Sequence, residues 1–154
     1  MDALTPVEVR PTDARLAPLI KRHLELMWAS SPACSVHAMD AESLDEAGVS
    51  FLAIFDGDEA VAMGALKALS VEHGELKSMH VAQERRGGGF ADSILRGLLQ
   101  LAIEKGLSRV SLETGSQPPF AAARAFYERN GFEFCPPFEG YTEDPASVFM
   151  TRAL

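Results

Sequence analysis

The chain has 154 residues, of which 47% are apolar and 23% charged, a composition typical of a globular protein and unlike that of a disordered or fibrous one. Its length fits one domain over residues 1–154. The 14 Lys and Arg against 22 Asp and Glu give a net charge of −8, which disfavours nucleic acid and anionic membranes as partners and mildly favours cationic ones. The first residues do not resemble a secretory signal, and no uncharged apolar stretch approaches the ~20 residues that span a bilayer, so we expect a cytoplasmic protein.

The first third of the chain predicts one short strand and two helices. Residues 7–10 are typical of a strand, which ends at Pro11. Thr12 and Asp13 offer side-chain oxygens that can cap a helix, and the residues after them share one helical face: Leu16, Leu19, Ile20, His23 and Met27. A shorter helix is expected over residues 40–47.

The rest of the chain begins with three strand-like runs, over residues 49–55, 60–69 and 75–81. The turns between them contain Asp56-Gly57 and His73-Gly74, so we expect an antiparallel meander. Five further elements follow a glycine-rich loop: a helix that ends at Gly106, a strand over residues 109–113, a helix over 121–129 and late strands over 132–135 and 147–151. This order predicts an α+β fold with a mixed sheet.

The loop between residues 81 and 92 is the most informative segment. It joins a strand to a helix and contains Arg85-Arg86 followed by Gly87-Gly88-Gly89. The first N–H groups of a helix have no intrahelical partner, glycines let a phosphate approach them closely, and arginines add charge-assisted contacts. The loop therefore predicts diphosphate binding, with a flexible turn and solvated arginines as the alternative.

Two common phosphate-binding loops fit this segment less well. No Gly-Lys-Ser/Thr sequence closes it, so it is not a P-loop. The dinucleotide fingerprint fits better, because Glu113 ends the next strand, but Asp92 stands where the third glycine is needed. The strands before the loop also form a meander instead of a repeating βαβ unit.

The segment Arg86-Gly87-Gly88-Gly89-Phe90-Ala91 resembles motif A of the GNAT superfamily of N-acetyltransferases, Arg/Gln-x-x-Gly-x-Gly/Ala at the start of a helix. Residues 123–132, with Phe126-Tyr127-Glu128 and Gly131-Phe132, resemble a second motif of that family in the expected order and separation. The resemblance implies the family's fold, a central, mixed, mostly antiparallel sheet of about six to seven strands flanked by about four helices. It also implies acetyl-CoA as co-substrate, held by Met79, His80, Val81, Arg85, Arg86, Gly87, Gly88, Gly89, Phe90, Ala91 and Asp92.

A narrower resemblance is to a bacterial branch of the family named after YsnE. It rests on short segments along the second half of the chain: His73-Gly74-Glu75, Lys77-Ser78-Met79, Leu112-Glu113-Thr114-Gly115-Ser116, Cys135, Pro137-Phe138, Asp144-Pro145 and Ser147-Val148-Phe149-Met150. This resemblance indicates a subfamily without indicating the acetyl acceptor.

Acetyl transfer needs an acid for the departing thiolate, and Tyr127 is the candidate. A thiol has a pKa near ~8.5 and tyrosine near ~10, so a tyrosine can protonate the thiolate without a large mismatch, as its family counterpart commonly does. The alternative is that Phe126 and Tyr127 are simply a buried aromatic pair.

The base is expected at Glu75, where some relatives have a catalytic glutamate, with Glu113 on the neighbouring strand or a water chain as alternatives. Even spacing places Glu75, Lys77, Met79 and Val81 on one face of their strand if no bulge intervenes. By resemblance, a backbone N–H near Met79 stabilises the oxyanion.

Together these features predict an N-acetyltransferase that acts by direct transfer in a ternary complex. The acceptor is expected to be a primary amine of a small molecule, with a peptide amine as the alternative, and whether the chain forms a homodimer is left open. Candidate acceptor-site residues are Trp28, His37, Glu113 and Tyr141. Neither the scattered histidines nor the two cysteines, Cys34 and Cys135, predict a metal site or a nucleophile. The alternatives are a regulatory module that binds acyl-CoA without turnover and a nucleotide-dependent oxidoreductase.

Overall fold

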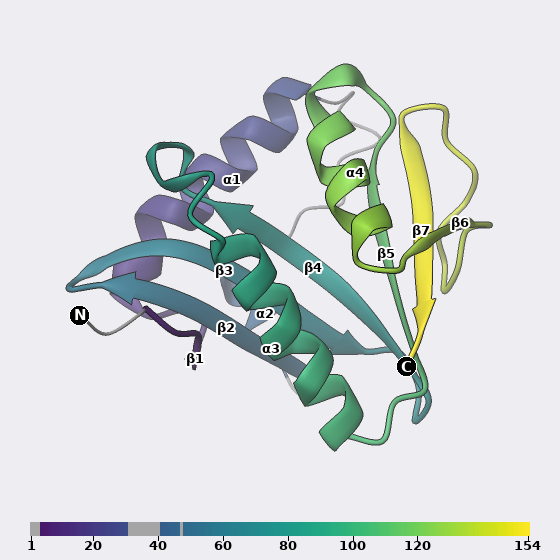
Figure 1. Cartoon of the computed structure of the whole chain (residues 1–154), viewed down its shortest axis with the longest axis horizontal. Helices are drawn as coiled ribbons and strands as arrows, with labels where there is room; N and C mark the ends of the chain where they lie inside the picture. The colour runs from purple at the N-terminus through teal and green to yellow at the C-terminus, as the bar shows by residue number, and fades with distance from the viewer. Residues whose placement is uncertain (1–3, 31–40, 47) are drawn as a thin grey trace.

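In the computed structural model, which describes residues 4–30, 41–46 and 48–154, one seven-stranded sheet runs through the molecule in the order β1-β2-β3-β4-β5-β7-β6 (Figure 1). Among the described strands, β4 and β5 form the one parallel pair. The strands are β1 Val7–Glu8, β2 Val49–Asp56, β3 Glu59–Ala68, β4 His73–Val81, β5 Arg109–Gly115, β6 Glu133–Cys135 and β7 Ser147–Ala153. The predicted class, a mixed and mostly antiparallel sheet in an α+β fold, is confirmed.

Helices cover both faces of this sheet. In the described part of the chain there are three longer α-helices and the four-residue α2, joined by short 3-10 turns: α1 Ala17–Ser30, α2 Ala41–Leu44, α3 Phe90–Glu104, α4 Ala121–Arg129, η1 Ala14–Leu16, η3 Gln83–Arg85 and η4 Pro118–Phe120. The short α2 falls within the predicted helix 40–47, whose two end residues lie outside the described part. The first strand has two residues instead of the predicted four, because Val9 and Arg10 already lead into the turn before η1.

The sheet separates two hydrophobic cores, as the alternating directions of the side chains along β2 show. Leu52 and Ile54 point to the face covered by α3, whereas Phe51 and Ala53 point to the face covered by α1 and α2. Helix α3 approaches the sheet closely at Gly64 of β3, where an added Cβ would lie 2.7 Å from Ile94 and 2.9 Å from Leu98. This close approach sets the position of α3, and therefore of the glycine loop at its start, relative to β4.

Strands β4 and β5 pair over only part of their length. The paired residues run from His73 with Arg109 to Leu76 with Leu112, and beyond that point the two strands are no longer hydrogen-bonded to each other. Strand β5 stays paired with β7 up to Gly115 and β4 stays paired with β3 up to Val81, so the two parts of the sheet diverge between β4 and β5. The splay leaves the edge of residues 77–81 without a neighbouring strand on the β5 side.

A bulge at Ser78 accompanies the divergence. On β3, Ala65 pairs with Lys77 and Met63 with His80, so two residues of β4 lie opposite Gly64. Ser78 has a φ of 56°, in the left-handed region that few residues other than glycine adopt. The extra residue reverses the alternation, so Met79 packs with the α3-side core while His80 faces His23 of α1. The common face of Glu75, Lys77, Met79 and Val81 was expected only if no bulge intervened, and the bulge places Met79 and Val81 on the other face from Glu75 and Lys77.

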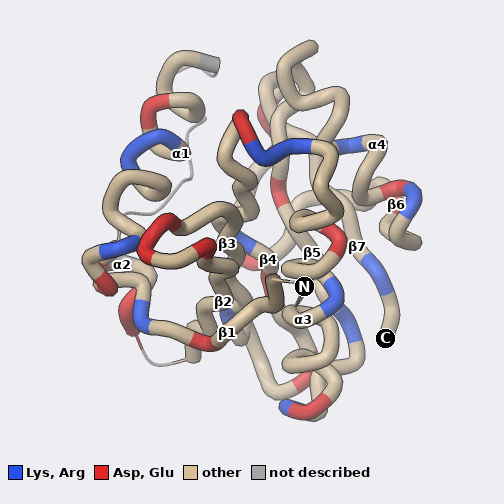
Figure 2. The backbone as a smooth tube through the Cα atoms, turned by 60° about the vertical axis from the view of Figure 1, so that its left-hand side comes forward, with Lys and Arg blue, Asp and Glu red and all other residues tan. Residues whose placement is uncertain are grey.

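Charged positions of both signs are interspersed along the chain, with short basic segments next to acidic ones (Figure 2). No helix in the described part of the chain is both long and apolar enough to cross a membrane.

Candidate functional site

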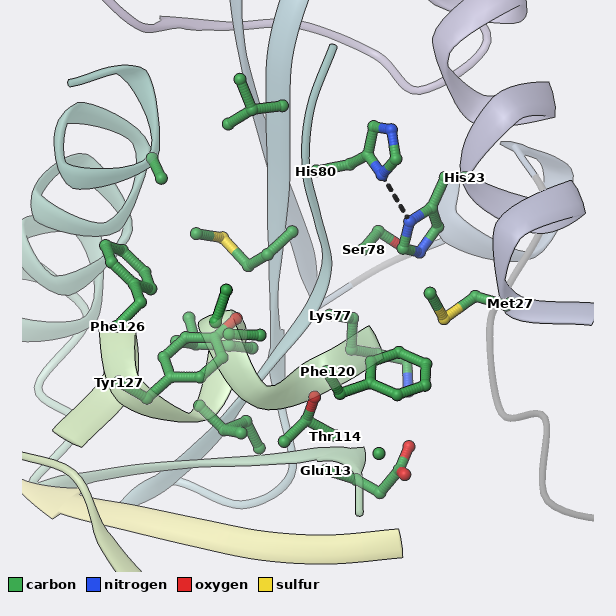
Figure 3. A pocket seen from close by; sticks show the side chains of 18 of the residues that line it. His23, Met27, Lys77, Ser78, His80, Glu113, Thr114, Phe120, Phe126 and Tyr127 are labelled. Carbon is green, nitrogen blue, oxygen red and sulfur yellow. Dashed lines mark hydrogen bonds between the residues drawn. The ribbon is translucent and has the colours of Figure 1, made fainter. Parts of the chain in front are cut away.

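A cavity of about 490 Å³ occupies the space where β4 and β5 diverge (Figure 3). Helix α1 contributes His23 and Met27 to its wall, and α4 contributes Phe126, Tyr127 and Arg129. The strands contribute most of the polar side chains, Glu75, Lys77, Ser78, His80, Glu113 and Thr114, together with the apolar Met79 and Val81. The cavity therefore joins the edge of β4 that was predicted to bind the co-substrate to all of the predicted catalytic residues.

The glycine loop opens onto this cavity and onto a second one of about 350 Å³ at the start of α3. Gly87 and Gly89 have φ values of 83° and 81°, and a Cβ at either would meet nothing within 4 Å, so open space lies above the loop. Gly89 caps α3 without a side-chain hydrogen bond, and this leaves the first N–H groups of the helix for a ligand. The loop thus fits a diphosphate, with Asp92 able to offer its backbone N–H but not its carboxylate.

The two arginines of the loop differ in their surroundings. The Arg85 guanidinium lies 2.8 Å from Asp56 at the end of β2 and 3.4 Å from Glu59 at the start of β3, and these carboxylates raise the pKa of Arg85. Arg86 lines both cavities, whereas Arg85 lines only the second cavity, at the start of α3. Arg86 is therefore the better placed of the two to contact a phosphate.

Arg129 of α4 also lines both cavities, next to Phe126. Its guanidinium carbon lies 5.8 Å from the centre of the Phe126 ring, which places the charge near the cavity mouth. The sequence motif that contains Phe126 also contains Arg129, but no spacing in the sequence indicated that α4 would bring it to the glycine loop.

Tyr127 is 6% exposed and packs edge-on against Phe126 and Phe132, with ring centres 5.2 Å and 5.6 Å apart. Burial raises the pKa of its hydroxyl, so the group stays protonated at neutral pH. Among the residues that the structure describes, the hydroxyl has no hydrogen-bond partner, although the side chain lines the cavity. A neutral donor that faces a cavity can give a proton to a bound group, so the buried position is compatible with the role of an acid.

Glu75 is 4% exposed and belongs to a hydrogen-bonded group of three side chains. The Tyr141 hydroxyl donates to Glu75 Oε2 at 2.6 Å, and Lys77 Nζ donates to the same oxygen at 3.3 Å. Lys77 Nζ also donates to the Tyr141 hydroxyl oxygen at 3.3 Å. The favoured base and one predicted acceptor-site residue are thus in direct contact, although 66 positions separate them in the chain.

The other predicted acceptor-site residues have different outcomes. Glu113 lines the cavity from β5. Trp28 is 57% exposed and does not line the cavity, to which its helix contributes Leu26 and Met27 instead, so the structure does not bring Trp28 together with the other predicted residues. His37 and Cys34 lie outside the described residues. Cys135 is on β6, away from the residues that line the cavity.

A comparison with known protein families matches residues 19–132 to the Acetyltransferase (GNAT) family. The chain belongs to this GNAT family. It is 41% identical to the N-acetyltransferase YsnE of Bacillus subtilis over 93% of this chain and 95% of that protein. It is also 41% identical to the N-acetyltransferase YedL of Escherichia coli, over 88% of this chain and 86% of that one.

A solved structure with 30% identity, a putative acyl-CoA N-acyltransferase from Klebsiella pneumoniae, superposes with a TM-score of 0.79 over 98% of this chain and 97% of that one. The predicted resemblance to the GNAT family and to its YsnE branch is confirmed. The strands before the glycine loop are antiparallel, as in GNAT proteins, whereas a dinucleotide-binding oxidoreductase needs a parallel βαβ unit there. The oxidoreductase alternative has no support in this topology.

Proposed function

We propose that this GNAT protein transfers the acetyl group of acetyl-CoA to the primary amine of a small molecule, by direct attack in a ternary complex. One observation carries the proposal. A single cavity connects the open glycine loop at the start of α3 with Tyr127 of α4 and with the carboxylates of Glu75 and Glu113. The loop holds the diphosphate at one end, and the carboxylates receive a cationic amine at the other.

The co-substrate would follow the free edge of β4. Backbone groups of residues 79–81 face the splay and can pair with the amide-containing arm of the coenzyme, while the amides of residues 87–92 bind its diphosphate. Arg86 and Arg129 supply positive charge next to these amides. This path brings the thioester to the level of the Ser78 bulge.

The chemical step requires an acid, a base and an oxyanion donor. Tyr127 gives its proton to the departing thiolate, since its hydroxyl is neutral and faces the cavity. Glu75 accepts the proton that the amine loses, and a backbone N–H near Met79 stabilises the oxyanion. Nucleophilic catalysis by a cysteine is not part of the proposal, because Cys135 lies away from the cavity.

The experiment that tests this function measures thiol release from acetyl-CoA with a panel of small amines and a matched panel of peptides. We expect turnover with at least one small amine, and initial-velocity lines that intersect when both substrates are varied. Parallel lines would indicate an acetyl-enzyme intermediate instead of a ternary complex. Tight binding of acetyl-CoA with no thiol release in any reaction would favour the regulatory module.

A further inference from the structure

We propose that Tyr141 is a catalytic residue that passes the proton of the acceptor amine to Glu75. The inference rests on the proposed acetyl transfer and assigns a role to a side chain from the 136–146 segment between β6 and β7. Its basis is the contact between the Tyr141 hydroxyl and Glu75 Oε2 at 2.6 Å, at the wall of the cavity.

Tyr141 is held in place from two sides. Its ring packs against Phe138 and Phe149, with ring centres 5.2 Å and 5.4 Å away. Its hydroxyl is fixed by Glu75 and by Lys77, whose Nζ lies 3.3 Å from the hydroxyl oxygen. A short hydrogen bond with a constrained ring is the arrangement that a relay needs, since the proton moves along a bond that already exists.

The same contacts make direct proton transfer to Glu75 less favourable. Its Oε2 atom already accepts hydrogen bonds from Tyr141 and Lys77, and the residue is 4% exposed. Tyr141 lines the cavity, and its oxygen accepts a long hydrogen bond from Lys77 Nζ at 3.3 Å, a position that an incoming amine N–H can take over. The amine can therefore use the tyrosine oxygen where other enzymes use a water molecule.

The bound ammonium first gives one proton to solvent. The neutral amine nitrogen then attacks the thioester carbon, and the adduct carries a positive nitrogen and an oxyanion. That nitrogen gives a proton to the Tyr141 oxygen while the Tyr141 proton moves to Glu75 Oε2. As the C–S bond breaks, the thiolate takes a proton from Tyr127. Glu75 later returns its proton to solvent and Tyr127 regains one, so the products are an amide and a thiol.

The charged groups around Tyr141 support transfer without ionisation of the phenol. Glu75 and Lys77 face it from β4, and Glu113 acts on it from β5. Burial, with the carboxylates of Glu75 and Glu113, raises the pKa of Tyr141. A tyrosinate is disfavoured, so the incoming and outgoing protons must move together, and Glu75 has to be ionised at the start.

A double-mutant cycle tests the relay. Tyr141→Phe should lower kcat about ten- to hundredfold with the Kd for acetyl-CoA unchanged, an effect at or just below the lower limit of the range of about 10²- to 10⁴-fold for general acid–base catalysis. Adding Tyr141→Phe to Glu75→Gln should then change kcat less than about twofold, because the relay is already broken. In mixtures of H₂O and D₂O, the rate should report two protons in flight for the unmodified chain and fewer for Tyr141→Phe.

A second readout does not depend on turnover. The chain has two tyrosines, so Tyr127→Phe leaves Tyr141 as the only one that absorbs as tyrosinate. Adding Glu75→Gln should lower the pH at which Tyr141 ionises, since the hydrogen bond to the carboxylate is lost. The folded state of each variant is checked by thermal unfolding.

Three results would overturn the relay. Multiplicative effects of the two substitutions would show independent roles, and a higher KM with unchanged kcat in Tyr141→Phe would make the residue an acceptor-binding group only. An unchanged ionisation pH in Glu75→Gln would remove the contact on which the inference rests. If the unmodified chain transfers acetyl groups and these results are found, only the relay fails. If the unmodified chain transfers none, the proposed function fails and the relay fails with it.

Discussion

His23 and His80 are hydrogen-bonded to each other through their Nδ1 atoms, which lie 3.1 Å apart (Figure 3). The contact joins α1 to β4 just beyond the Ser78 bulge, so it ties together two elements that line the cavity. Burial is the main cause that lowers the pKa of both rings to about 4. The neighbouring His80 lowers the pKa of His23 further, and the positive charges of Arg86 and Arg22 lower the pKa of His80 further. Both histidines are therefore neutral at pH 7.

Acid should destabilise the folded chain through this histidine pair. Each ring has a pKa of about 4 in the folded chain against the ordinary histidine value of 6.5, so the unfolded state binds more protons between these values and stability falls as the pH drops below 6.5. Between pH 6.5 and 5 the loss should be about 2 kcal/mol for His23 and less for the more exposed His80. Urea unfolding at several pH values measures it.

The variant His23→Asn supplies the comparison for that measurement, because it removes one of the two buried titrating groups. Between pH 6.5 and 5, this variant should lose less of its free energy of unfolding than the unmodified chain. His73→Asn is the matched control, since His73 lies at the other end of β4 and bonds to Ser111. An equal pH slope in all three chains would show that the buried pair does not control acid stability.

Tyr127→Phe should abolish most of the turnover and leave co-substrate binding almost intact. The substitution removes only the hydroxyl, and the ring keeps its contacts with Phe126 and Phe132. We expect kcat to fall by about 10²- to 10⁴-fold, the usual range for a lost general acid, and the Kd for acetyl-CoA to change less than about threefold. Steady-state kinetics and titration calorimetry measure the two quantities. Equal activity at every pH would remove Tyr127 from the mechanism.

Gly89 and Gly106 form a matched pair for a test of the glycine loop. Their φ values are 81° and 80°, and a Cβ at either position would meet nothing within 4 Å. Substitution by alanine should therefore cost the same backbone strain at both positions, about 1 kcal/mol in unfolding measurements. Only Gly89→Ala should weaken acetyl-CoA binding, and Gly89→Glu should abolish it through repulsion of the diphosphate. Similar Kd values for Gly89→Ala and Gly106→Ala would place the diphosphate elsewhere.

Arg86 and Arg85 should contribute unequally to co-substrate binding. Arg86→Ala removes a charge from both cavities, so the Kd for acetyl-CoA should rise roughly ten- to hundredfold, as expected for a lost charge-assisted hydrogen bond. Arg85→Ala should have a smaller effect, because Arg85 is bonded to Asp56 and Glu59. Calorimetry at low and high salt compares the two variants. A larger loss in Arg85→Ala would show that its ion pairs open when the co-substrate binds.

Local patterns predicted most of the fold. The period of apolar residues in α3, the Asn130-Gly131 stop after α4 and the turn at Gly57 depend on neighbours a few positions apart, and the structure has each of them, with φ values of 86° at Gly131 and 64° at Gly57. The glycine loop could be predicted for the same reason, because its arginines and glycines are consecutive. The position of β7 between β5 and β6 could not be predicted, since a long-range strand pairing leaves no local signal in the sequence.

The sequence by itself determined the family, the α+β class and the loop at the start of α3, and it made Tyr127 the candidate acid, because each depends on residue types at short, fixed spacings. Only the tertiary structure decided which side chains meet. The Ser78 bulge reversed the alternation of β4, the splay of β4 from β5 opened the cavity, and the return of residues 136–146 brought Tyr141 onto Glu75. These contacts join residues far apart in the chain, and their geometry follows from how the sheet and helices pack against one another.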